Sequence, residues 1–178
     1  MKSLFLGALA ALSLILASPA FAGMPVLGFE VGVTTLDQVR ARLGIKDPAN
    51  DLPINAYSNG PMVDVDAADE GVEGLKSVLY IFDTDKRLCA VVMKLDTERF
   101  DFVYRSLAPK YKLVHSERPF VGNQYARFQA KDGIIEASAP HMSFEMEVRY
   151  LRADFFKAYL AKSAADRAAK ARHDQAQF

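Results

Sequence analysis

Histidine is the commonest general base and metal ligand near neutral pH, so the three histidines are the first candidates for chemistry. They are His115, His141 and His173. No two of them stand at a metal-ligand spacing such as His-x-x-x-His, and the single cysteine, Cys89, excludes a zinc site built on several thiolates. The sequence therefore predicts neither a metal centre nor a bound cofactor.

His141 is the histidine best placed for function, because it follows Pro140 in a turn expected between two strands. A hydrolase centred on His141 is one hypothesis, although no nucleophile or catalytic residue can be assigned from the pattern. His115 is interpreted as a structural residue that shares a strand face with Leu113. His173 is expected to be solvated in a polar tail.

A second candidate site is the polar side of the expected strand at residues 143–150. Glu145 and Glu147 would project from it about 7 Å apart, a separation that glycoside hydrolases use for paired carboxylates. Polar side chains on a solvated strand face are the simpler interpretation, with Arg149 available for an ion pair. We expect the face of Glu145, Glu147 and Arg149, together with His141, to bind a partner.

The acidic run at residues 64–73 holds five carboxylates, which suggests calcium because that ion prefers several oxygen ligands. Its spacing does not follow the EF-hand loop, and a solvated acidic loop is the alternative. The sequence also lacks a glycine-rich phosphate loop, a Gly-x-Ser-x-Gly elbow and a His-Glu-x-x-His motif. These patterns favour a non-enzymatic protein.

The first 22 residues indicate where the protein works. Lys2 precedes an apolar run of about 15 residues, shorter than the roughly 20 that span a bilayer, and the run ends before a small-x-small pattern at Ala20 and Ala22. We predict a signal peptide over residues 1–22 and a periplasmic or secreted protein with no membrane span. No cysteine stands at the end of the leader, so no lipid anchor is expected.

Composition supports one domain without a nucleic-acid partner. The chain has 22 basic and 22 acidic residues, so no strong positive field would attract phosphates. Without an intramolecular disulfide the fold depends on its core. Cys89 is expected to be a buried apolar side chain that shares a strand face with Val91, Met93 and Leu95.

The apolar period switches between helical and extended along the chain, which predicts an α+β fold. Amphipathic helices are expected at residues 35–44, with Thr35 and Gln38 as a capping box, and at residues 96–107. Asn59 and Gly60 suggest a turn before an edge strand that contains Pro61. Further strands are expected at residues 75–82, 87–95, 111–116, 123–130, 134–139 and 143–150.

The order of elements predicts an antiparallel sheet with amphipathic helices on one face, arranged as two helix-plus-meander units. Residues 23–160 form the expected single domain. Residues 161–178 are alanine-rich and charged, which predicts a polar helical tail that projects into solvent, with a partner-binding arm as the alternative.

Residues 32–44, GVTTLDQVRARLG, resemble the helix-opening signature of small bacterial envelope proteins of the SmpA/OmlA (BamE-like) and β-lactamase-inhibitor-like group. The likeness lies in Gly32 and Thr34 at the start, Val39 on the inner side and the closing Gly44. It implies a helix packed on an antiparallel sheet, an envelope location and a protein-binding role. It carries no site residues across.

Three function hypotheses follow. The leading one is an exported, non-enzymatic module that binds an envelope protein or a peptide, through a sheet edge or through the face of Glu145, Glu147 and Arg149. The second is a carrier of a small apolar ligand, suggested by aromatic residues that could line a pocket between sheet and helices. These aromatic residues are Phe100, Phe102, Phe120, Phe128, Phe144 and Phe155. The third is the hydrolase centred on His141.

Overall fold

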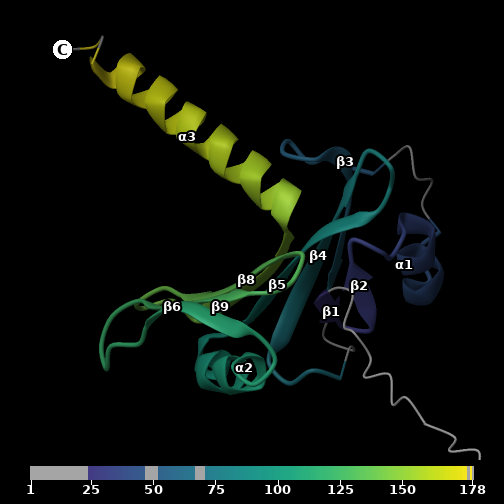
Figure 1. Ribbon diagram of the computed structural model, residues 1–178, viewed down its shortest axis with the longest axis horizontal. Coiled ribbons are helices and arrows are strands. Elements are labelled where there is room, and N and C mark those ends of the chain that lie inside the picture. Colours follow the sequence, from purple (N-terminus) through teal and green to yellow (C-terminus); the bar gives the residue numbers. More distant parts are fainter. Residues whose placement is uncertain (1–23, 47–51, 67–70, 176, 178) are drawn as a thin grey trace, which may run out of the picture.

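The computed structural model describes residues 24–46, 52–66, 71–175 and 177, and these form an α+β fold (Figure 1). The helices are α1 (Leu36–Leu43), the 3-10 turn η2 (Thr97–Arg99), α2 (Phe100–Leu107) and α3 (Ala153–Gln175). The strands are β1 (Met24–Val26), β2 (Phe29–Val31), β3 (Asn59–Asp66), β4 (Leu75–Asp83), β5 (Leu88–Asp96), β6 (Lys112–Glu117), β7 (Gln124–Gln129), β8 (Gly133–Ala139) and β9 (Glu145–Arg152).

Seven strands make one antiparallel sheet in the order β3-β4-β5-β9-β8-β7-β6. The meander β3-β4-β5 follows α1, the meander β6-β7-β8-β9 follows α2, and pairing of β5 with β9 joins them. The expected antiparallel sheet and its helices are therefore confirmed. The sequence analysis missed the small hairpin of β1 and β2, which turns at Leu27 and Gly28, both at positive φ.

Helix α1 begins and ends where its local signals predict. The Thr35 side chain accepts from the Gln38 N–H, and the Gln38 side chain accepts from the Thr35 N–H at 2.8 Å, so the capping box is complete. Gly44 ends the helix in the left-handed conformation, where a side chain would be strained. Leu36 and Val39 are fully buried and fasten the helix to the core.

The main core lies on the face of the sheet that α1, α2 and the β1–β2 hairpin cover. Phe100 and Leu107 of α2 are buried there with Tyr80 and Phe82 of β4 and Phe128 of β7. The edge of the Phe29 ring meets the Tyr80 ring at 5.4 Å between centroids. This apolar face drives the packing of both meanders around one core.

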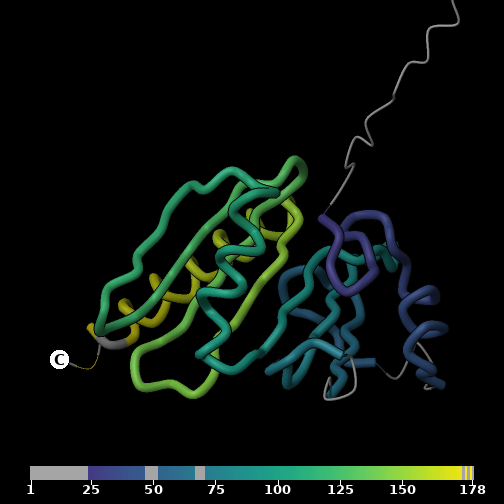
Figure 2. Tube along the Cα trace, turned by 90° about the horizontal axis from the view of Figure 1, so that it is seen from below, coloured from purple at the N-terminus to yellow at the C-terminus, as the bar shows by residue number. Residues whose placement is uncertain are grey.

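The opposite face of the sheet, here called the open face, is covered in part by the first turns of α3 and by Tyr57 of the loop before β3. Phe155 is buried there with Ile81, Cys89, Ile134 and Leu151. Figure 2 shows α2 and α3 on opposite sides of β6–β9. The two amphipathic helices α1 and α2 therefore share one face as predicted, and the C-terminal helix α3 starts on the other.

The second half of α3 leaves the body of the protein (Figure 1). From Ala161 to His173 its side chains are exposed, apart from half-buried Ser163. Near the point where the helix leaves the body, Nζ of Lys162 donates to the Ala56 carbonyl at 3.0 Å. The predicted polar tail is thus the projecting part of α3, and the preceding part of the same helix, which anchors it, is short.

The expected turn before β3 lies between Asn55 and Gly60, since the Asn55 N–H donates to the Gly60 carbonyl at 2.8 Å. Asn59 has a φ of 55°, as a turn residue requires. Strand β3 is at the edge of the sheet, where Pro61 removes no central ladder bond.

Two irregularities in the strand ladders reverse expected side-chain directions. Ile81 pairs with Ala90 while Phe82 pairs with Leu88, so Cys89 is an extra, bulged residue and faces the open side, away from Val91, Met93 and Leu95. A second shift lies between Leu113 and His115. The expected shared faces of Cys89 and of His115 are therefore wrong.

The predicted leader, residues 1–22, lies outside the described residues. Within the described part of the chain, no helix combines the length and apolar character that a bilayer span requires.

Candidate functional site

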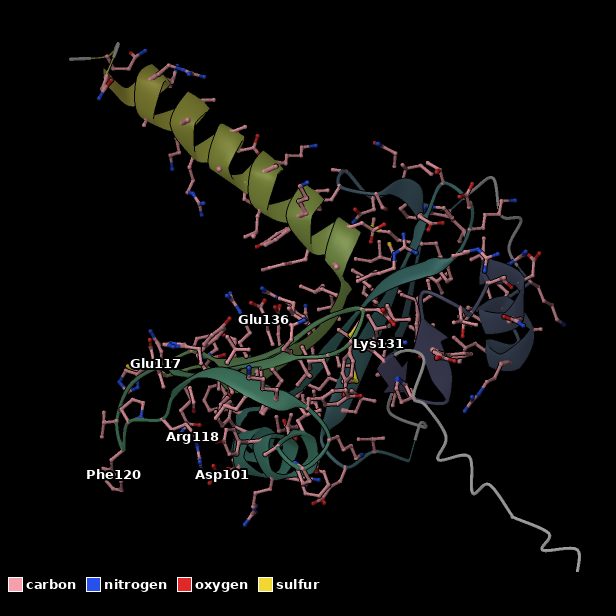
Figure 3. All side chains as sticks on the ribbon, in the orientation of Figure 1. Asp101, Glu117, Arg118, Phe120, Lys131 and Glu136 are labelled. Atoms are coloured by element: carbon pink, nitrogen blue, oxygen red, sulfur yellow. The ribbon has the colours of Figure 1, made fainter. Side chains whose placement is uncertain are left out.

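The most unusual surface of the protein lies at the tips of two adjacent loops. Phe120 and Val121, between β6 and β7, are 103% and 68% exposed, and Met142 and Phe144, between β8 and β9, are 88% and 89% exposed. We call these four residues the loop-tip surface. Figure 3 shows Phe120 at the outer end of its loop, away from the core.

The two loops meet around a shallow cavity of about 240 Å³. Val121, His141 and Met142 all line it, and the His141 N–H donates to Oδ1 of Asn123 at 2.7 Å. Phe144 was among the aromatic residues expected to line a pocket, but it precedes the ladder of β9 and is exposed to solvent. The exposed apolar side chains are therefore grouped on one surface rather than scattered.

His141 lies at this surface without catalytic partners. It is exposed, and in the described part of the chain only its backbone takes part in a hydrogen bond. The geometry of a general base, which is oriented by a carboxylate and in reach of a nucleophile, is not formed there. The structure gives the hydrolase hypothesis no support and leaves His141 as a surface residue between the loops.

The three predicted residues of β9 point to the open face but are divided between two ion pairs. The Arg149 guanidinium donates to Glu147 Oε2, and Nζ of Lys76 lies 3.5 Å from Glu145 Oε1. Burial by itself would lower the pKa of Arg149, but the hydrogen bond and the negative charge of Glu147 raise it by more. The pKa of Arg149 is therefore raised. Because both carboxylates are engaged in ion pairs with different cations, the pair is not arranged as glycosidase carboxylates would be.

Beside them, β7 and β8 carry a network of three polar side chains, Tyr125, Arg127 and Glu136. Glu136 is buried, and its Oε1 accepts from the Tyr125 hydroxyl at 2.6 Å and from Nη2 of Arg127 at 2.8 Å. Burial, and then the bond to Glu136, raises the pKa of Tyr125 to about 12. We interpret this network as a structural unit, because the buried carboxylate accepts hydrogen bonds from both of its neighbours through Oε1.

A groove of about 270 Å³ separates α3 from the open face. Leu79 and Val92 form part of its floor, while Tyr57 and Tyr159 meet edge to face at 5.2 Å beside it. The carrier hypothesis expected a larger pocket lined by several phenylalanines, whereas Phe155 is the single one here. Phe100 and Phe128 are instead fully buried in the core.

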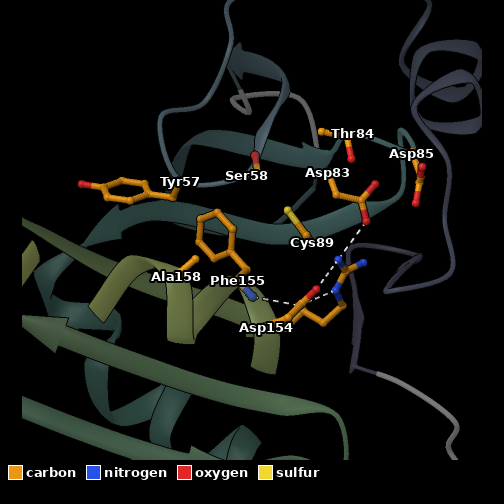
Figure 4. Close-up of a pocket in the computed structure, with 10 residues that line it drawn as sticks. Tyr57, Ser58, Asp83, Thr84, Asp85, Cys89, Asp154, Phe155 and Ala158 are labelled. Carbon is orange, nitrogen blue, oxygen red and sulfur yellow. Dashed lines mark hydrogen bonds and ion pairs between the residues drawn. The ribbon is translucent and has the colours of Figure 1, made fainter. Parts of the chain in front are cut away.

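A polar cavity of about 300 Å³ lies at the start of α3 (Figure 4). In it the Arg152 guanidinium bridges Asp83, at 2.8 Å, and Asp154, at 2.6 Å. Cys89 is at its inner side, and its Sγ donates to the Ile81 carbonyl at 3.3 Å. Burial raises the pKa of this thiol to about 12, which makes it a poor nucleophile.

The calcium hypothesis concerned residues 64–73, of which residues 67–70 lie outside the described residues. Among the described residues of this run, Glu73 forms an ion pair with Arg99, whose Nη1 lies 2.8 Å from Glu73 Oε2. Among the residues described, no group of three or more His, Cys, Asp or Glu side chains is arranged to hold a metal ion.

No family model, curated protein or solved structure matches this chain. The BamE-like resemblance of residues 32–44 thus stays a prediction, since no comparison tests it. What the structure defines is an antiparallel α+β protein with one apolar surface at its loop tips. Phe120 and Phe144 were predicted to line a pocket. Their positions close to Gly122 and Ser143, residue types that are typical of turns, could have indicated that they are exposed.

Proposed function

We propose that this chain is an exported, non-enzymatic protein of the cell envelope that binds another protein through the loop-tip surface. One observation carries the proposal: four large apolar side chains on two linked loops are about two-thirds to fully exposed. Soluble proteins seldom keep such a cluster in water unless it is covered by a partner. His141 and Glu145 lie at its border, while Glu147 and Arg149 lie further along the open face.

Two features support binding by a rigid surface. Both loops are anchored on strands of the central sheet, and the Asn123 side chain bonds across from one to the other. A surface that keeps its shape before binding loses less conformational entropy when the partner arrives. Export rests on the leader alone, and N-terminal sequencing of the mature protein should find Gly23 first. An intact Met1 would contradict export.

Site-directed photo-cross-linking tests the binding surface. A benzophenone side chain in place of Phe120 or Phe144 should form adducts with a protein in an envelope extract. The matched control is Ile54, an exposed apolar residue (63%) next to the far edge strand β3. Equal yields from Ile54 and Phe120, or no protein adduct from either loop, would contradict the proposal.

A further inference from the structure

The charges beside Phe144 are mostly negative. Asp96 and Glu98 line a hollow of about 420 Å³ together with Phe144, and Glu145 follows it in the chain. Lys76 is shared between two of these carboxylates, with Nζ 3.1 Å from Asp96 and 3.5 Å from Glu145. Glu98 is exposed and has no ion-pair partner among the described residues. This side of the loop-tip surface therefore keeps an excess of carboxylate.

Negative charge also exceeds positive charge beside Phe120. Glu117, Arg118 and Asp101 lie there, at one end of the molecule (Figure 3). Arg118 is already engaged, because its Nη2 is 2.5 Å from Asp101 and its guanidinium lies 4.3 Å from the Tyr104 ring centre. Glu117 contacts Nε2 of His115 at 2.8 Å, and that ring is a cation only when protonated. The exposed Glu117 thus adds a second negative border.

We infer that the segment recognised by the loop-tip surface is a cationic amphipathic stretch of another protein, with aromatic or aliphatic side chains next to lysine or arginine. This inference rests on the proposed function and names the chemistry of its partner. The apolar side chains would cover Phe120, Val121, Met142 and Phe144, while the basic ones would reach Glu98 and Glu117. Complementary charges at a rim select partners and speed their encounter.

The same border of carboxylates argues against an anionic membrane as the occupant. Loops tipped with phenylalanine can enter a lipid surface, but binding to anionic lipid is helped by lysine and arginine around the apolar residues. Here two basic side chains near the rim, Lys76 and Arg118, are held by carboxylates. Acidic lipid headgroups would be repelled rather than attracted.

A set of three labelled peptides tests the inference on the full mature chain. The first alternates Phe and Leu with Lys and Arg, the second replaces every basic residue with Glu, and the third replaces every apolar residue with Ser. We expect the first to bind at least tenfold more tightly than either of the others by fluorescence anisotropy. Its affinity should fall as salt rises from 50 to 500 mM, because exposed charges are screened.

Variants of the protein separate the contribution of charge from that of apolar contact. The double variant Glu98→Lys/Glu117→Lys should weaken binding of the basic peptide at least fivefold and strengthen binding of the acidic one. Asp85→Lys is the matched control, since Asp85 is exposed in the β4–β5 turn at the other end of β5, and it should change neither affinity. Phe120→Ser/Phe144→Ser should weaken the basic peptide at least tenfold.

The outcomes distinguish the inference from the function on which it rests. If both charged peptides bind equally and Phe120→Ser/Phe144→Ser weakens both, the cationic class is wrong and the protein-binding surface stands. If the basic peptide binds but that double variant has no effect, both are overturned. Failure of the basic peptide to bind, or sedimentation of the chain with vesicles of anionic phospholipid but not with the peptide, also overturns the inference. Circular dichroism of every variant should match that of the unaltered chain.

Discussion

The backbone N–H of His141 donates to Oδ1 of Asn123 at 2.7 Å, so a single side chain joins the two loops that carry the loop-tip surface. Asn123 lies immediately before β7, and His141 lies two residues after β8 ends. Because neighbouring strands position both loops, the bond sets the spacing between Phe120 and Met142 rather than the stability of the sheet.

Asn123→Ala should therefore affect binding more than folding. Loss of one partly exposed hydrogen bond costs about 1 kcal/mol, which corresponds to a roughly fivefold weaker affinity if the loops must be ordered for the partner. The measurement is titration with the basic amphipathic peptide, alongside hydrogen exchange of the two loops. Asn123→Asp keeps the acceptor oxygen and is the control; equal loss of affinity in both variants would rule out this role.

Tyr125 should titrate well above an ordinary tyrosine. Burial and its bond to the Glu136 carboxylate raise the pKa of Tyr125 to about 12. An ultraviolet titration near 295 nm should therefore lose one late transition, near pH 12, in Tyr125→Phe, which assigns the signal; burial raises the pKa of Tyr150 further, so its transition should come later still. In Glu136→Gln the Tyr125 transition should move down towards 10, because the neutral amide no longer opposes the phenolate. An unchanged transition would contradict the bond.

The bridge from Arg152 to Asp154 should make stability depend on acid pH. Arg152 lowers the pKa of Asp154 from its usual value of 3.8, so the contribution of the pair is full above that value and is lost as pH falls through the lowered pKa. Asp154→Asn should destabilise the protein at pH 6, by less than about 1 kcal/mol because Asp154 is exposed. The difference from the unaltered chain should vanish near pH 2.

The measurement is urea unfolding at pH 6, 4 and 2, with Asp85→Asn as the control on an exposed carboxylate in the neighbouring turn. A difference between Asp154→Asn and the unaltered chain that stays constant from pH 6 to pH 2 would mean that the lost side chain matters by packing alone.

Cys89 should be inert in the folded protein. Its thiol is buried and its pKa is about 12, so the reactive thiolate is scarce even at pH 9. Iodoacetamide at pH 8.5 should label the native chain only as fast as it unfolds, and should label it within minutes in 8 M urea. Labelling of the native chain at the rate of a free thiol would show that the cavity beside Cys89 opens.

Much of the fold could be predicted because the relevant signals are local. Thr35, Gln38 and Gly44 cap α1 through contacts within a few residues, and these contacts would form wherever the helix packed. The apolar runs of β4 and β5 likewise predicted two buried, central strands, and both are. Such features require only neighbouring residues and water.

The candidate site was harder to predict. Side chains alternate between the two faces of a strand only while its pairing with the neighbouring strand stays regular. The bulge at Cys89 and the shift between Leu113 and His115 each reverse the faces of the residues beyond them, and both depend on how the partner strand pairs. Phe144 was placed in the strand predicted at residues 143–150, but β9 begins at Glu145, two residues later, so Phe144 lies in the loop.

The chain alone therefore determined its fold class, the capped helix and the positions of most strands, since these follow from short-range preferences and apolar period. The tertiary structure decided which residues meet. Asn123 and His141 are brought together by the antiparallel pairing of β7 with β8, and this contact gathers Phe120, Val121, Met142 and Phe144 on one surface. Local sequence patterns do not predict that contact, because it forms only after distant segments of the chain have paired.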